Sequence, residues 1–147
     1  MKRRSIAVAV LALALVAGGC PKSAYHSAVV AEHQFTTVLK SFQQAELVEH
    51  QNGRIDDAEH KVLEAGIEKV ATAAQVLVTS LQAGAANTTV QQNFATVSQA
   101  VNDLMAQGIA VKNPTSQALV KAVLQSAQAI LTNVQQLLSA QPATGGK

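Results

Sequence analysis

Apolar residues recur at intervals of three and four along most of this 147-residue chain. In the second of four such segments the apolar positions are Leu63, Ile67, Val70, Ala74, Leu77 and Leu81. Because an α-helix has about 3.6 residues per turn, this spacing places them on one face. The pattern predicts four amphipathic helices, at about residues 24–50, 57–83, 88–107 and 114–140.

The first predicted helix has a face made of aromatic and small residues. Its members are Ala28, Ala31, Phe35, Val38, Phe42 and Ala45, and Leu39 widens it. Glu46 and Glu49 are assigned to the outer side of the helix. We therefore expect both glutamates at the surface.

Residues typical of helix starts precede the later segments. Asp56 with Glu59 three residues on is typical of a capping box, because each side chain can bind a free amide of the first turn. Asn87 or Thr88 is the expected cap of the third helix. Asn113 is the expected cap of the fourth, with Pro114 in its first turn.

Short connections separate the four segments. Asn52-Gly53 predicts a tight turn, and Gly84 and Gly108 are the expected ends of the second and third helices. No stretch alternates apolar and polar residues as a strand does. The sequence thus predicts an all-α, antiparallel up-down-up-down four-helix bundle over residues 24–140, followed by a disordered tail at 141–147. The alternative is a partly open helical hairpin whose core is completed by self-association.

The first 20 residues follow a different pattern. An apolar run at residues 6–17 follows the basic residues Lys2, Arg3 and Arg4. After the run come small residues and then Cys20, the only cysteine of the chain. The run is about 18 Å long as a helix. A membrane-spanning helix needs about 20 apolar residues, so residues 1–19 are predicted to be a cleaved signal peptide.

The sequence Ala17-Gly18-Gly19-Cys20 resembles the lipobox of bacterial lipoproteins. The resemblance implies cleavage between Gly19 and Cys20, attachment of diacylglycerol to the Cys20 sulfur and further acylation, such as with palmitate, of the new terminus. Residues 20–23 would then be a lipidated tether. Pro21, in place of Asp, favours the outer membrane facing the periplasm, or the outer face of the plasma membrane in a single-membrane cell. The alternative is a secreted protein with an incidental thiol.

Charge excludes some partners of the mature chain. Without residues 1–19 it has eight basic and nine acidic residues, a net charge near −1. There is no basic cluster for nucleic acid. From Ala71 onward the only acid is Asp103, against three lysines, so the exposed faces of the later helices must be polar and nearly uncharged.

Candidate chemistry is sparse. His26 and His33 lie two turns apart on one helix, and Glu46 with His50 is expected to form a surface pair. Residues 48–59 imitate part of a calcium-binding loop, but Val48 and His50 occupy its first and third ligand places. We predict no metal, no cofactor and no catalytic residue.

The expected function is that of a lipid-anchored envelope protein with a non-catalytic structural or protein-interaction role. Its partner would be another envelope protein or a second copy. Two alternatives remain: a carrier of a small apolar ligand between its helices, and a phage-encoded envelope lipoprotein that excludes superinfection. A large dry cavity would favour the carrier.

Overall fold

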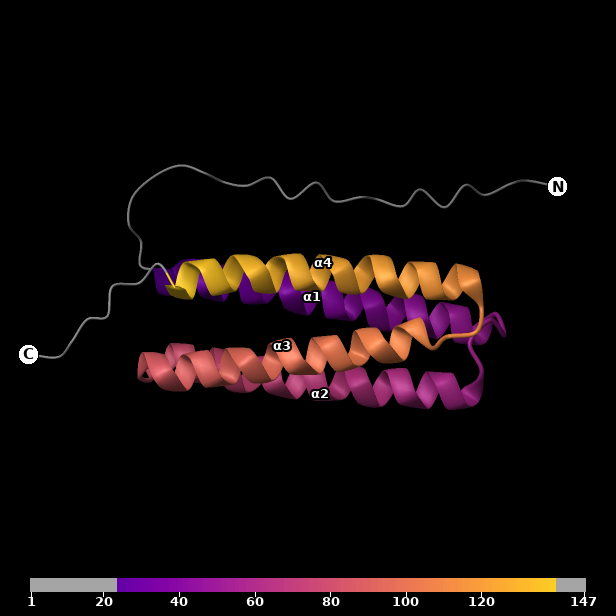
Figure 1. Cartoon of the computed structure of the whole chain (residues 1–147), viewed down its shortest axis with the longest axis horizontal. Helices are drawn as coiled ribbons and strands as arrows, with labels where there is room; N and C mark the ends of the chain where they lie inside the picture. The colour runs from indigo at the N-terminus through magenta and orange to yellow at the C-terminus, as the bar shows by residue number, and fades with distance from the viewer. Residues whose placement is uncertain (1–23, 140–147) are drawn as a thin grey trace, which may run out of the picture.

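The structure, a computed structural model, describes residues 24–139 and consists of four long helices in this range (Figure 1). They are α1 (Ala24–Gln51), α2 (Asp57–Gln82), α3 (Asn87–Ile109) and α4 (Pro114–Ser139). Successive helices run in opposite directions, so the chain forms an up-down-up-down bundle. The observed bounds differ from the expected ranges by at most two residues. The expected tail at 141–147 lies outside the described residues.

The four helices form a closed ring. Each helix packs against its two neighbours, in the pairs α1–α2, α2–α3, α3–α4 and α1–α4. The last pair joins the first and last helices of the chain and closes the bundle. Among the residues described there is no strand. The closed bundle, and not the open hairpin, is therefore the architecture of this chain.

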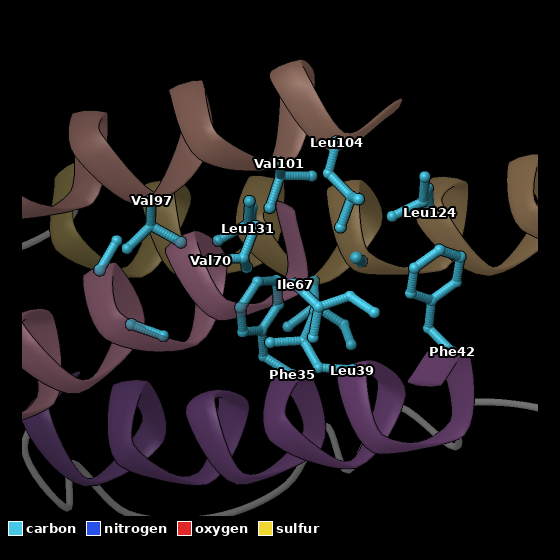
Figure 2. Close-up of a cluster of buried hydrophobic side chains, with 14 of the residues drawn as sticks. Phe35, Leu39, Phe42, Ile67, Val70, Val97, Val101, Leu104, Leu124 and Leu131 are labelled. Carbon is cyan, nitrogen blue, oxygen red and sulfur yellow. The ribbon is translucent and has the colours of Figure 1, made fainter. Parts of the chain in front are cut away.

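Apolar side chains from all four helices fill the space between them (Figure 2). The central layers contain Phe42 from α1, Val70 from α2, Leu104 from α3 and Leu124 from α4, each no more than 1% exposed. Such a core provides most of the stability of a bundle, because each fully buried large apolar side chain contributes about 1.5–3 kcal/mol.

The buried face of α1 differs from the predicted one in its last two turns. Ala45 is only half-buried, whereas Glu46 and Glu49 are 1% and 6% exposed. The prediction that both glutamates lie at the surface is therefore wrong. The spacing of three and four continues from Phe42 to residues 46 and 49, so the helix turns two carboxylates into the bundle.

Gly108 does not end α3. The helix continues to Ile109, and Gly108 is buried within it. A β-carbon at this position would collide with Cγ1 of Val120 on α4. The glycine therefore lets α3 and α4 approach closely. Gly53 lies in the turn after α1, and Gly84 lies in the turn after α2. Both have a left-handed backbone, with φ of 68° and 64°, which glycine adopts readily.

Candidate functional site

The two ends of the bundle differ in what they contain. The start of α1, the end of α4 and the α2–α3 turn lie together at one end, on the left in Figure 1. The α1–α2 and α3–α4 connections lie at the opposite end. Cys20 and Gly19, the predicted lipidation and cleavage residues, lie outside the described residues, as do the side chains of Tyr25 and His26.

A group of polar side chains lies inside the end that holds the α1–α2 and α3–α4 connections. We call it the polar cluster, and its members are Glu46, Glu49, His50, Arg54, His60 and Ser116. Glu46, Glu49 and Ser116 are the buried polar residues of the described part of the chain. Burial of a carboxylate is costly unless it is paired, so Glu46 and Glu49 need polar partners inside the bundle.

Glu46 pairs with His60 of α2. The distance from Glu46 Oε1 to His60 Nδ1 is 2.5 Å. This hydrogen bond raises the pKa of His60, against the opposing effect of burial. His60 Nε2 lies 3.6 Å from Glu64 on the same helix. The other oxygen of Glu46, Oε2, is buried and has no hydrogen-bond partner in the structure, so its desolvation is only partly compensated.

His50 stacks on His60. The ring centroids are 4.1 Å apart and the planes are inclined by 7°. His50 Nδ1 lies 3.0 Å from the carbonyl oxygen of Ile55, and Nε2 lies 3.6 Å from Asp57. The expected surface pair of Glu46 with His50 is therefore wrong, because the buried Glu46 pairs with His60 from the next helix. His33, in contrast, is exposed.

Glu49 connects three segments. Arg54, in the α1–α2 turn, donates from Nη1 to both oxygens of Glu49 at 3.0 and 3.3 Å. The hydroxyl of Ser116 on α4 donates to Glu49 Oε2 at 2.6 Å. The Ser116 side chain is 0% exposed, so this hydroxyl is enclosed in the bundle and does not face solvent. The arrangement neutralises Glu49 and ties α1 to α4.

The capping residues of α2 also join the two connections. Asp56 accepts from the backbone amides of Ala58 and Glu59, and the Glu59 side chain accepts from the Asp56 amide. Lys112, in the α3–α4 connection, donates from Nζ to Asp56 and from its backbone amide to Glu59, at 2.7 and 2.9 Å. The contact with Lys112 lowers the pKa of Asp56. The capping box of α2 therefore links the α1–α2 connection to the α3–α4 connection.

The caps of α3 and α4 differ from each other. Asn113 Oδ1 accepts from the amides of Thr115 and Ser116 at 3.0 and 3.2 Å, so Asn113 caps α4. Asn87 is the first residue of α3, and the cap position belongs to Ala86, which makes no side-chain cap hydrogen bond. The prediction that Asn87 caps α3 is therefore wrong. The helix begins at Asn87 itself, one residue earlier than predicted.

Replacing these two asparagines should separate their roles. Asn113→Ala leaves the amides of Thr115 and Ser116 without their acceptor and should lower the free energy of unfolding by about 0.5–2 kcal/mol. Asn87→Ala removes no cap hydrogen bond and should change it by less than about 0.5 kcal/mol. Urea unfolding followed by circular dichroism measures both. Equal losses in the two variants would contradict the assignment.

The polar cluster does not have the arrangement of a metal site. Among residues 24–139 no group of three or more His, Cys, Asp or Glu side chains is placed to hold a metal ion. In the segment that imitates a calcium loop, Asp56 and Glu59 are engaged as helix caps, and Val48 has a half-exposed apolar side chain.

The surface bears open grooves between neighbouring helices. The largest described, with a volume of about 1000 Å³, runs between α2 and α3 and is lined by mostly uncharged side chains such as Thr72, Val76, Thr96 and Ala100. A smaller one lies between α1 and α2. These hollows lie outside the apolar core, along the seams between helices.

Known proteins give no further guide. No family model, no curated protein and no solved structure matches this chain. No helix within residues 24–139 combines the length and the apolar character needed to cross a membrane.

Proposed function

We propose that this chain is a lipid-anchored, non-catalytic protein of the bacterial cell envelope, held in the outer membrane and facing the periplasm. In a single-membrane cell it would be held on the outer face of the plasma membrane. Its role is to present a helical surface to another envelope protein or to a second copy. The observation that carries the proposal is Ala17-Gly18-Gly19-Cys20 after a basic and apolar leader.

The position of α1 supports this role. The helix begins at Ala24, so only Pro21, Lys22 and Ser23 separate it from Cys20. Three residues reach at most about 11 Å, which keeps the end of the bundle with α1's start close to the lipid. The 28 residues of α1 span about 42 Å, so the polar cluster lies at the end far from the anchor.

The hollows of the molecule favour an interaction role over a carrier role. A carrier of a small apolar ligand needs a concave site that buries most of the ligand. The α2–α3 groove is open to solvent, and apolar side chains from all four helices occupy the space between them. An open groove with a mostly uncharged lining suits a protein surface, because little charge must be desolvated.

Replacing Cys20 with Ala tests the anchor. The variant should move almost entirely from the detergent-extracted membrane fraction to the soluble fraction, and it should no longer incorporate a palmitate analogue. Ser23→Ala is the matched control, because it changes a neighbouring residue and leaves the thiol. Retention of Cys20→Ala in the membrane fraction would refute the proposed anchor.

A further inference from the structure

Ile55 is a core residue that lies outside the four helices. It belongs to the α1–α2 connection, yet its side chain is 1% exposed. Its amide donates to the carbonyl oxygen of Glu49 at 3.4 Å, and its own carbonyl oxygen accepts from Nδ1 of His50 at 3.0 Å. Both partners belong to the last turn of α1. Ile55 therefore closes the core at the end that holds the α1–α2 and α3–α4 connections, which we call the distal end.

A chain of contacts joins Ile55 to the buried Glu46. The ring of His50 that contacts Ile55 also stacks on His60, with ring centroids 4.1 Å apart. His60 in turn lies 2.5 Å from Glu46 Oε1. Glu46 and His50 are four residues apart on α1, whereas His60 is on α2. The position of Ile55 therefore depends on His60 through a single intervening ring.

The charged groups that face His60 are carboxylates. Glu46 faces it from α1, and Asp57 and Glu64 face it from α2 itself. His50, the other group against its ring, has its Nδ1 proton engaged with the connection. Each of the three carboxylates favours the protonated form of His60. The proton on His60 therefore supplies positive charge to a region that is otherwise negative.

The other cations of the distal end are engaged elsewhere or lie in solvent. Arg54 donates to Glu49, and Lys112 donates to Asp56. Lys61, next to His60 in the sequence, is exposed and forms no ion pair among the described residues. None of these three cations contacts Glu46 in the described part of the chain, so His60 is the group that offsets its charge.

The helices α3 and α4 supply no cation to Glu46 within residues 24–139. α3 carries Asp103, which lines the α2–α3 groove together with Glu68 and Lys69. α4 carries Lys121, which is exposed. Oε2 of Glu46 has no hydrogen-bond partner in the structure. The charge of a side chain that is 1% exposed thus depends on one ionisable partner.

We propose that the distal end is a proton-controlled closure, in which loss of the His60 proton releases Ile55 and opens the last two turns of α1 while the opposite end of the bundle stays folded. Neutral His60 can still donate from Nδ1, but it no longer offsets the charge of Glu46. A buried carboxylate without a counter-charge is costly, and it regains hydration when its segment leaves the bundle. Helix ends and turns open at a lower free energy than the middle of a core, so the opening stays local.

The closure opens as pH rises. The hydrogen bond with Glu46 raises the pKa of His60 above its ordinary value. The closed form, in which the pair is intact, therefore binds the proton more tightly than the open form, in which His60 faces water. This preference for the closed form is fully present below the ordinary pKa of about 6.5 and is lost as pH rises through the raised pKa. It does not depend on the proposed lipid anchor, which belongs to the opposite end.

Hydrogen exchange followed by mass spectrometry tests the closure on the full processed chain in mild detergent. Protection is measured at pH 5.5 and pH 8.5, relative to the exchange of an unfolded chain at the same pH. Residues 42–63 report the distal end, and residues 73–98 report the opposite end. Protection of the distal end should fall at least about threefold at pH 8.5, and that of the opposite end should change less. An equal fall at both ends, or no fall at the distal end, would overturn the proposal.

Glu46→Gln separates the charge of this side chain from its shape. The amide oxygen can still accept from His60 Nδ1, but the buried charge is gone, so distal protection should no longer fall with rising pH. His33→Gln, at an exposed position on α1, is the matched control and should keep the fall. If Glu46→Gln does not fold, the double variant Glu46→Leu with His60→Leu gives the same test. A fall that persists without the Glu46 charge would show that another group controls the opening, against the proposal.

Ile55→Ala tests whether this residue closes the distal end. The loss of a buried side chain of this size should lower distal protection about tenfold or more already at pH 5.5, and residues 73–98 should change much less. Leu47→Ala, at a position 43% exposed on α1, is the control and should leave both ends nearly unchanged. Equal losses at the two ends in Ile55→Ala would show that Ile55 supports the whole bundle and would contradict its role in the closure.

Discussion

Replacing His60 with Leu should lower the free energy of unfolding by about 3–5 kcal/mol at pH 6. The substitution leaves the carboxylate of Glu46, which is 1% exposed, without its only hydrogen-bond partner among the described residues. A buried charge that loses its partner cannot recover the hydration that folding removed. Urea unfolding of residues 21–147, followed by circular dichroism, gives the difference.

The double variant Glu46→Leu with His60→Leu is the informative comparison. Replacing a buried ion pair by apolar side chains of similar size is often neutral or stabilising, so the double variant should recover most of the loss. His33→Leu changes an exposed histidine on α1 and should have little effect. If the double variant is as unstable as His60→Leu, the loss has another cause than the unpaired carboxylate.

The pair should also make stability depend on pH. The hydrogen bond with Glu46 raises the pKa of His60 above its usual value, so the folded chain holds this proton more tightly than the unfolded chain does. The resulting stabilisation is fully present below the unfolded pKa of about 6.5 and is lost as pH rises through the raised pKa. The double variant should lack this decline, which unfolding at pH 5.5 and pH 8.5 would show.

Replacing Leu104 with Ala should lower the free energy of unfolding by about 3–5 kcal/mol. Leu104 is 0% exposed and lies in the central layers of the core, so its removal leaves a cavity that the four long helices cannot collapse to fill. The same urea titration measures the loss. Leu47→Ala, at a position 43% exposed on α1, is the control and should cost less than about 1 kcal/mol.

Gly66 offers a partial compensation for this cavity. A β-carbon on Gly66 would lie 2.7 Å from Leu104 Cδ1, too close for the wild-type core, and would also displace the end of the Gln107 side chain. Without the leucine, the methyl group has space and the helix gains the propensity of alanine, worth up to about 1 kcal/mol. Gly66→Ala should therefore stabilise the Leu104→Ala chain. A further loss in the double variant would contradict the described packing of α2 against α3.

The architecture could be predicted from the sequence because local signals agree with the fold. The spacing of Leu63, Ile67 and Val70 gives the buried face of α2, and all three are buried in the bundle. Asp56 and Glu59 identify the start of the same helix because their partners are amides of its first turn. Signals of this kind need only residues close in sequence.

The polar cluster could not be predicted because its partners come from distant parts of the chain. Glu46 pairs with a histidine 14 residues away, and Glu49 accepts a hydrogen bond from a serine 67 residues away. A carboxylate is more often exposed, so Ala45 was the more plausible core residue. The continued spacing from Phe42 to residues 46 and 49 was the one available signal. Gly108 was misassigned similarly, because its reason is the proximity of Val120 on α4.

The contact between α1 and α4 also constrains the order in which the bundle assembles. Helices that follow one another in the chain, such as α2 and α3, can dock as soon as their short connection has formed. Such local contacts favour rapid folding. The α1–α4 pair instead joins the beginning of the chain to its end. A chain that emerges from a ribosome or a translocation pore with its N-terminus first cannot close the ring until α4 is released, so its core stays open during transit.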